Sequence, residues 1–396
     1  MPHFNVHRTL DNGYELYAGQ AIIDAGFTMD DLLEIAQLAF GASVGGSGSF
    51  RSLVGIAYGD NVDSRQDHIL ITHNKKPIGL VLTYPRFYQM GDKSILSIGI
   101  GTVSAHPDYR GQGIMQTMMN CALERCKVEG AAFMSLGGQR QRYATFGFEN
   151  VSAHPMYSFN ARNFRGVEPM DASQVEHVRE DVIENYEFLS ELYEIYLRHV
   201  RTPSRGDLDN FARTVRMWEY DLYVLRNADD EIIGYARGKK YKPEAESLIL
   251  EELCIEPEDL IPFLALMVKD GKPDVSASAH QVEIQQTLQQ YCEGSDLAHR
   301  IKASFTNCEQ TVALALAQNP FGCPPYEREL RTINALGEAE SFMIPAQSEG
   351  EPIELSYQEF QMLFSLQYRY ELSPDIQVAL APLLPLTLPD LYADQV

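Results

Sequence analysis

One segment constrains the fold of this chain more than any other: an apolar run is followed by a short loop with two glycines and then by a long amphipathic stretch. The run covers residues 95–105, the loop reads His-Pro-Asp-Tyr-Arg-Gly-Gln-Gly, and residues 112–129 repeat apolar side chains at helical spacing. This order predicts a strand that turns directly into a helix. Gly111 and Gly113 let the backbone approach a ligand where a Cβ would collide. The N–H groups of the first helical turn then favour a phosphate or pyrophosphate.

The spacing separates this loop from other phosphate loops. No Gly-Lys-Ser/Thr ending follows Gly113, and position 116 is Gln116 where a dinucleotide fingerprint needs a third glycine. Arg110-x-x-Gly113-x-Met115 instead resembles the pyrophosphate motif of the GNAT acetyltransferases, usually written Q/R-x-x-G-x-G/A, with Met115 as a departure. Arg110 adds positive charge for the same oxygens.

A second segment supports the same resemblance. Residues 143–149 read Tyr-Ala-Thr-Phe-Gly-Phe-Glu, which is similar to the Tyr-x-x-Phe-Gly-Phe signature of that superfamily. The two motifs stand in the family's order and at a family-like separation. Together they cover about residues 103–149.

Composition limits the possible partners. The chain has 396 residues, enough for two or three domains, and its 45% hydrophobic and 22% charged content is ordinary for a soluble globular protein. Its net charge of −23 argues against a nucleic-acid partner. The charge is compatible with capture of cations such as amines, polyamines or lysine side chains, and equally with a role in solubility alone.

The six cysteines predict neither disulfides nor a metal site. No Cys-x-x-Cys pair occurs, and no His/Cys cluster has zinc spacing. We therefore expect no metal and a reducing, cytoplasmic location. The first ten residues carry no apolar signal core, and no run reaches membrane-spanning length, so no membrane partner is expected.

We divide the chain into three regions, residues 1–160, 161–290 and 291–396. In the first, Thr28 and Asp31 predict a helix start, and residues 41–49 are rich in glycine and serine and predict a loop. The other expected elements are a hairpin of residues 69–72 and 77–84, a strand over 95–105, a helix over 112–129, a strand over 133–136 and a brief helix ending near 146.

The second region repeats this pattern without its chemistry. We expect helices over 173–198 and 208–215, followed by strands over 222–226, 232–239 and 247–254. The strand–loop–helix equivalent, residues 252–260, holds no Arg-x-x-Gly. Its Glu256, Glu258 and Asp259 would repel a pyrophosphate. The region is therefore predicted to be a second GNAT-like fold that lacks a cofactor site.

The third region differs from both. Strand-like apolar runs cover residues 312–317 and 341–344, and Ser356 and Glu359 form a capping box that opens a helix. Residues 383–392 are apolar and interrupted by prolines, which predicts a docked tail.

The three regions together resemble the Eis-like (enhanced intracellular survival) acetyltransferases. The resemblance implies tandem GNAT-like α/β folds, with mixed sheets flanked by helices, followed by an α+β domain similar to sterol carrier proteins. It also implies a homo-oligomer, commonly a hexamer, that acetylates amines with acetyl-CoA. Some members of the family modify aminoglycosides.

The resemblance also implies roles for individual residues. Tyr143 matches the tyrosine that protonates the departing CoA thiolate. The base in this family is the C-terminal carboxylate, which here belongs to Val396, where relatives often end in an aromatic residue. The implied cofactor-binding residues are Val103, Ser104 and Ala105 of the splayed strand, and Arg110, Gly111, Gln112, Gly113, Ile114, Met115 and Gln116 of the loop.

The implied reaction is direct attack of a neutral amine on the acetyl thioester, with backbone N–H groups stabilising the oxyanion. The acceptor is expected to be a cationic small molecule of aminoglycoside or polyamine type. Two alternatives stay open: a protein or peptide lysine acetyltransferase, and a non-catalytic acyl-CoA or lipid-binding sensor.

Other candidates have competing interpretations. His106 is predicted to be a turn residue, and Asp108 to cap the loop. Arg140 and Arg142 would contact either CoA phosphates or acidic neighbours.

Aromatic residues near the glycine-serine loop are also ambiguous. Phe40, Phe50 and Arg51 would line an acceptor pocket or, for the aromatics, pack in the core. Trp218, the single tryptophan, is expected in the core.

Overall fold

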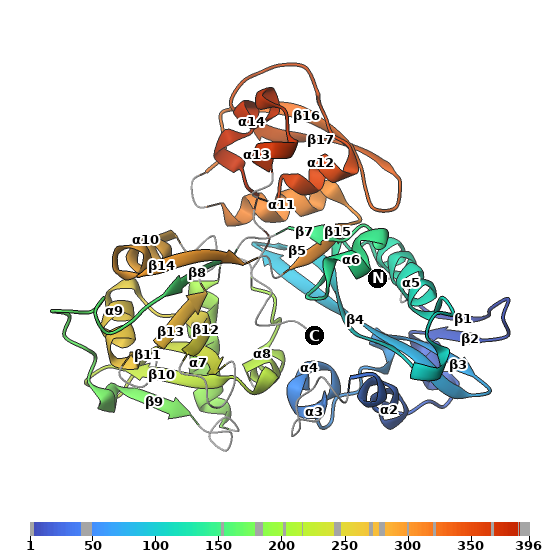
Figure 1. Cartoon of the computed structure of the whole chain (residues 1–396), viewed down its shortest axis with the longest axis horizontal. Coiled ribbons are helices and arrows are strands. Elements are labelled where there is room, and N and C mark those ends of the chain that lie inside the picture. Colours follow the sequence, from blue (N-terminus) through green and yellow to red (C-terminus); the bar gives the residue numbers. More distant parts are fainter. Residues whose placement is uncertain are drawn as a thin grey trace.

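The computed structural model describes residues 4–40, 50–151, 154–178, 185–200, 203–215, 217–240, 247–268, 272–276, 282–298, 301–319, 322–365, 368–386 and 388. These residues form three β-sheets, each with its own helices, and Figure 1 shows them as three lobes. None of the helices in these ranges is both long and apolar enough to cross a membrane.

The first sheet has eight strands. Their order is β1 (Val6–Thr9), β2 (Glu15–Ala18), β3 (His68–His73), β4 (Lys76–Met90), β5 (Lys93–Ala105), β6 (Phe133–Leu136), β15 (Lys302–Phe305) and β7 (Glu149–Asn150). The predicted hairpin is confirmed as β3 and β4. Asn74 and Lys75 form its two-residue turn with positive φ angles of 51° and 63°, as tight hairpin turns require.

Helices cover both faces of this sheet. On one face lie α5 (Ile114–Glu129) and α6 (Arg140–Tyr143), which share a core with β2 to β6. On the other lie α2 (Met29–Phe40), α3 (Phe50–Leu53) and α4 (Gly55–Tyr58), as Figure 1 shows. The predicted start of α2 is confirmed, because the Asp31 N–H donates to the Thr28 hydroxyl at 3.2 Å and the Asp31 carboxylate accepts from the Thr28 N–H at 2.7 Å. The predicted 41–49 loop lies outside the described residues.

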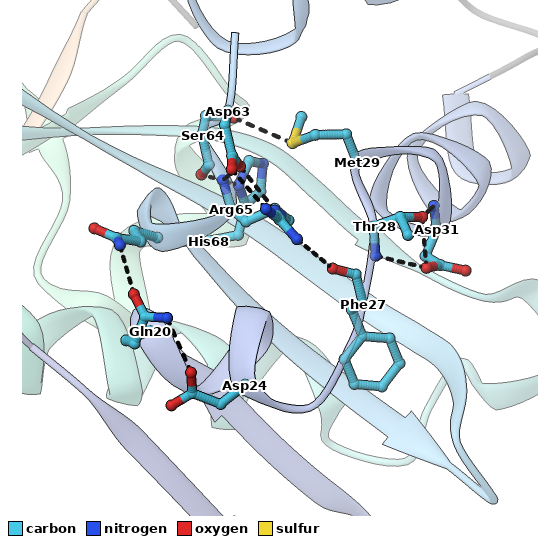
Figure 2. A network of polar contacts seen from close by, with 11 residues as sticks. Gln20, Asp24, Phe27, Thr28, Met29, Asp31, Asp63, Ser64, Arg65 and His68 are labelled. Carbon is cyan, nitrogen blue, oxygen red and sulfur yellow. Dashed lines mark hydrogen bonds and ion pairs between the residues drawn. The ribbon is translucent and has the colours of Figure 1, made fainter.

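A polar corner fixes these helices to the start of β3 (Figure 2). Arg65, in the turn η1 (Arg65–Asp67), donates to the Phe27 carbonyl at 3.0 Å, just before α2. Gln66 in the same turn donates to Gln20 at 2.7 Å, and Gln20 donates to Asp24 at 2.9 Å within α1 (Gln20–Asp24).

The second sheet has seven strands. Their order is β14 (Gly294–Ala298), β8 (His154–Ser158), β13 (Lys272–Ser276), β12 (Ser247–Cys254), β11 (Ile232–Lys240), β10 (Asp221–Arg226) and β9 (Val175–Val178). Its helices are α7 (Tyr186–His199), α8 (Leu208–Val215), α9 (Pro257–Met267) and α10 (Val282–Tyr291). The three predicted strands and the helix over 208–215 are confirmed.

The predicted helix over 173–198 is wrong at residues 175–178, and its residues 179–184 lie outside the described residues. Residues 175–178 form β9, an edge strand antiparallel to β10, with Leu222 opposite Val178. The helix begins only at Tyr186, where the Asn185 side chain caps it. Val-Glu-His-Val has the alternation of a half-buried strand, which a helical interpretation of the whole stretch overlooked.

The third sheet has three strands, in the order β17 (Ala339–Ala346), β16 (Tyr326–Ile333) and β18 (Ile353–Glu354). Around it are α11 (Cys308–Gln318), α12 (Tyr357–Met362), α13 (Tyr368–Glu371) and α14 (Pro374–Ala379). The capping box of Ser356 and Glu359 and the strand over 341–344 are confirmed. The strand predicted over 312–317 is wrong: it lies in α11, because Asn307 caps this segment and alternating alanine and leucine favour a helix.

The chain returns to the first sheet between its second and third lobes. Strand β15 pairs with β6 and β7, so the first sheet is completed by residues 302–305. One apolar core then joins Tyr88 and Phe133 of the first sheet to the third lobe and includes Leu386 and Leu388. The tail is therefore docked as far as the structure describes it.

Candidate active site

Strand β5 diverges from its neighbour β6. The two strands pair in parallel only where Ser97 to Gly99 lie opposite Phe133 to Ser135. Beyond Gly99, β5 continues to Ala105 and pairs with β4 alone. The edge of β5 that faces β6 is thus available for main-chain hydrogen bonds to a ligand. Val103, Ser104 and Ala105 lie in this diverging part.

A β-bulge bends the same part of the strand. Leu80 on β4 faces Ser104, whereas Leu82 faces Gly101, so β5 carries one extra residue. Thr102 takes up the distortion with a φ of 49°. The buried Ser104 hydroxyl donates to the Thr102 carbonyl at 3.0 Å, and Val103 and Ala105 are half-buried. Bulges of this kind re-aim a strand next to active sites.

The loop after β5 presents an uncapped helix end. Gly111 and Gly113 have φ angles of 77° and 75°, and no atom lies within 4 Å of the position where either would carry a Cβ. Gly113 is the N-cap of α5 and supplies no side-chain cap; the first bond of the helix runs from the Thr117 N–H to the Gly113 carbonyl at 3.0 Å. The preceding N–H groups have no intrahelical acceptor, and the space beside Gly111 and Gly113 is open, which is the geometry of an anion site.

Aromatic residues at the ends of neighbouring strands, Tyr14 directly before β2 and His73 in β3, hold this loop. The Tyr14 hydroxyl donates to Gln112 Oε1 at 2.5 Å, and His73 Nδ1 lies 3.0 Å from the Tyr109 hydroxyl. The Tyr14 and His73 rings lie 5.1 Å apart. The Gln112 side chain is thereby tied to the protein, which leaves its backbone for a ligand. Tyr14 and His73 were missed from sequence, where nothing marks them.

The remaining loop positions divide into anchors and exposed groups. Ile114 is buried and Met115 packs partly against the core beneath α5. Arg110 and Gln116 are exposed. Arg110 makes no ion pair with any described residue, so its charge remains for a ligand.

Tyr143 ends α6 on the same face of the sheet. Its ring is 7% exposed and lies edge-on to Phe148, with centroids 6.1 Å apart. It packs so closely on Gly138 that a Cβ there would lie 2.4 Å from the ring. Burial raises the pKa of Tyr143, and the opposing effect of Arg142 does not cancel it. The phenol therefore keeps its proton at neutral pH.

The structure resolves several competing interpretations. Arg140 forms a bidentate ion pair with Glu149, so its partner is an acidic neighbour. His106 starts the turn before the loop, as expected. The predicted cap by Asp108 is wrong, because the His106 ring accepts from the Asp108 N–H at 3.2 Å.

The residues beside the 41–49 segment are explained by packing. Phe50 is buried, and Phe40 lies edge-on to it with centroids 5.6 Å apart. Trp218 packs partly buried against the same core. Arg51 pairs with Asp30 at 2.6 Å on the surface. Val396 lies outside the described residues, and within them no cluster of three or more His, Cys, Asp or Glu is arranged to hold a metal.

Comparison with known proteins identifies the first lobe. Residues 27–151 match the acetyltransferase (GNAT) domain family. Eis1 from Mycobacterium abscessus aligns with a TM-score of 0.63 at 14% identity, over 95% of this chain and 98% of that one. A GCN5-related N-acetyltransferase from Anabaena variabilis gives 0.60 at 17%, over 97% of each chain. A probable N-acyltransferase from Enterococcus faecalis gives 0.60 at 12%, over 95% of this chain and 97% of that one. No curated protein is significantly similar in sequence.

Residues 27–151 are therefore an acetyltransferase domain of the GNAT type, so the chain contains the domain of an acetyltransferase. The likeness to solved structures extends the fold, a mixed α/β arrangement with a large mixed sheet flanked by helices, over nearly the whole chain.

Proposed function

We propose that the chain transfers an acetyl group from acetyl-CoA to a primary amine of a cationic small molecule, of the aminoglycoside or polyamine type. The observation that carries this proposal is the open, uncapped N-terminus of α5 behind Gly111 and Gly113, which follows directly on a diverging, bulged strand. A GNAT domain that retains this geometry fits catalysis better than a non-catalytic sensor.

The CoA diphosphate would lie on the backbone N–H groups of residues 111–116, with Arg110 adding charge. The edge of β5 at Val103, Ser104 and Ala105 would pair with the amide groups of the pantetheine arm. This pairing directs the thioester into the gap between β5 and β6. A strand N–H there would stabilise the oxyanion as it forms.

The chemistry needs three proton transfers. The acceptor ammonium loses one proton to become a neutral amine, which attacks the thioester carbon, and its nitrogen then loses a second proton as the amide forms. We assign the carboxylate of Val396 as the base that accepts these protons and passes them to solvent. The C–S bond breaks, the thiolate takes the Tyr143 proton, and the phenolate is reprotonated from solvent, so that each turnover releases one net proton. Burial raises the pKa of Tyr143, so the phenol is protonated at neutral pH and holds the proton that it donates as the C–S bond breaks.

The test is release of CoA thiol from acetyl-CoA with spermidine, an aminoglycoside and a lysine peptide as acceptors. We expect turnover with the small polycations. Turnover with the peptide alone would replace the acceptor class by protein lysine, and binding of acetyl-CoA without turnover on any amine would overturn the proposal.

Two variants test the assigned groups. Tyr143→Phe should lower kcat by roughly 10²–10⁴-fold with little change in CoA affinity, because only proton donation is removed. Residues added after Val396 should lower kcat by displacing the carboxylate. Unchanged rates would remove these roles without affecting the cofactor site.

The family resemblance also motivates the proposal that the chain forms a homo-oligomer, specifically a hexamer. It further motivates the proposal that the third lobe is similar to sterol carrier proteins. Light scattering of the purified chain would test the first.

A further inference from the structure

A separate cavity of about 510 Å³ lies at the other end of α5. Arg125 and Glu129 from the last turns of the helix line it, together with Gln66 and Asp67 from the corner before β3. The sixteen residues of α5 span about 24 Å at 1.5 Å per residue, so this cavity is well removed from the glycine loop.

The hydrogen-bond donors of this cavity are almost fully used within the protein. Arg125, whose side chain is 7% exposed, directs Nε to Glu129 at 3.1 Å and Nη2 to Asp67 at 3.4 Å. Its Nη1 donates to the Thr83 hydroxyl at 2.7 Å and to the Gln66 carbonyl at 3.4 Å. The Gln66 amide donates to Gln20. A guanidinium has five N–H groups, and four of them are thus engaged.

The acceptors, in contrast, keep spare capacity. Two carboxylates face one guanidinium, which leaves one net negative charge. Asp67 accepts from Arg125 through Oδ1 only, among the described residues, and a carboxylate offers about four lone-pair positions. Glu129 accepts the Phe4 N–H at 3.3 Å through its second oxygen. The Gln66 side-chain oxygen is likewise not engaged by any described residue.

Other features of the wall favour the same ligand chemistry. The C-terminal end of a helix carries partial negative charge, and Lys127, the basic residue of this last turn, points to Glu338 at 2.6 Å instead. Phe87 and Leu96 add an apolar side to the cavity. Gln20, on its rim, donates to Asp24 (Figure 2) and accepts a hydrogen bond from the Gln66 amide.

We infer that this cavity binds a small primary organic amine, with its ammonium against Asp67 and Glu129 and its alkyl part against Phe87 and Leu96. An ammonium supplies three N–H donors for the spare acceptors and one positive charge that balances the net negative charge of the cavity. An anion would meet two carboxylates, and a neutral alcohol would leave the charge unbalanced. Burial raises the pKa of Asp67 to about 6 despite Arg125, consistent with a carboxylate that lacks sufficient positive charge around it.

Calorimetric titration of the full chain with n-pentylamine at pH 7.5, compared with 1-pentanol, tests this site. We expect one amine per chain and no heat from the alcohol. Asp67→Asn and Glu129→Gln should each weaken the amine at least tenfold. Glu124→Gln is the matched control, because Glu124 lies on the same helix but pairs with Arg8 at the surface, and it should bind as the wild type does.

The inference does not rest on the proposed acetyl transfer, and the two fail separately. Each variant is also titrated with CoA: retained CoA binding verifies the fold, while equal amine affinity in wild type and Asp67→Asn overturns the second site. Binding of pentanol as tight as that of pentylamine overturns it too. If CoA binds to none of the proteins, thermal melting verifies that each variant is folded. The difference in amine affinity between the wild type and Asp67→Asn then still decides whether the second site exists.

Discussion

The first and second sheets contain the same backbone arrangement, in which a strand diverges from its parallel neighbour, bulges and leads into a helix. Only in the first sheet does the space beside the diverging strand stay open. In the second sheet β12 pairs in parallel with β13 as far as Leu250 and then continues to Cys254 paired with β11 alone. Arg237 faces Glu252 while Gly238 faces Leu250, so β12 also carries an extra residue. A helix, α9, follows at once. Strand divergence, bulge and helix thus recur in the order seen around β5.

The side chains decide what each copy does. At α5 the cap is Gly113 and the first turn holds no acidic residue. At α9 the cap is Glu256, the first turn holds Glu258 and Asp259, and Pro257 has no N–H to offer. An anion is favoured at the first helix end and repelled at the second.

The diverging part of β12 is also occupied by an ion cluster. Glu252 accepts from Arg205 and Arg237 at 2.6 Å each and from the Tyr235 hydroxyl at 2.5 Å. Burial alone would raise the pKa of Glu252, but the two arginines lower it to about 2. In the second lobe this backbone opening therefore serves internal packing, whereas in the first lobe we propose that it serves a ligand. The difference supports the proposal that the second lobe is a GNAT-like fold without a cofactor site.

The largest change in free energy should come from breaking the ion cluster around Glu252. Glu252→Gln leaves two buried guanidinium groups without their carboxylate, and should lower the free energy of unfolding by about 3–5 kcal/mol. The Glu252 pKa is depressed, so its contribution is complete above about pH 4.5 and is lost as the pH falls towards 2. Chemical denaturation measures it. Glu256→Gln is the control and should change little, because the Glu256 side chain is exposed and lies 3.6 Å from His199; equal effects would mean the cluster is not structural.

The second largest effect should come from placing a side chain in the open glycine loop before α5. Gly113→Val introduces a Cβ at a φ of 75° and into the space of the diphosphate, and should weaken CoA about 100-fold, or about 2.7 kcal/mol. Gly91→Val carries the same backbone strain at a φ of 62° in a turn far from the loop. Calorimetry should find normal CoA binding there. If both variants bind CoA as the wild type does, the loop is not the cofactor site.

Two titratable residues beside the amine cavity, Asp67 and His68, should change the stability of the fold with pH in opposite directions. The Asp67 pKa is raised to about 6, so the folded state binds more protons than the unfolded one and stability falls as pH rises from about 4 to 6. Burial lowers the pKa of its neighbour His68 to about 4, which makes stability rise between about pH 4 and 6.5.

Asp67→Asn removes the first effect and leaves the second. The variant should therefore lose more stability than the wild type on acidification, by about 2–3 kcal/mol between pH 6 and 4. Denaturation at a series of pH values measures this. Parallel curves for the two proteins would contradict the assigned pKa of Asp67.

Removing the Tyr14 hydroxyl, which holds the glycine loop through Gln112, should have the smallest effect. Tyr14→Phe removes the hydroxyl that holds Gln112 and should weaken CoA three- to tenfold, about 1 kcal/mol. Tyr17→Phe, three residues further along the chain in β2 and stacked on His7, is the control. An equal loss in both would assign the effect to the strand and not to the hydroxyl.

The parts of the site that sequence predicts are local. Glycines at 111 and 113, the apolar strand before them and the amphipathic helix after them lie within about 35 consecutive residues, so spacing alone indicates their geometry. Tyr14, directly before β2, and His73, in β3, are distant from the loop in sequence and meet it only because β2 and β3 are neighbours in the sheet. The pairing of β15 with β6 and the approach of Arg205 to Glu252 likewise depend on topology, which no periodicity encodes. The error at residues 312–317 is different, because alternating Ala and Leu satisfy both a strand and a helix until Asn307 caps the segment.

Comparison of CoA with pantetheine, which lacks the diphosphate, tests the central assignment most directly. If the main-chain amides of residues 111–116 bind the diphosphate, CoA should bind at least 100-fold more tightly than pantetheine to the wild type, and the difference should disappear in Gly113→Val. Equal affinity of the wild-type chain for both molecules would contradict it.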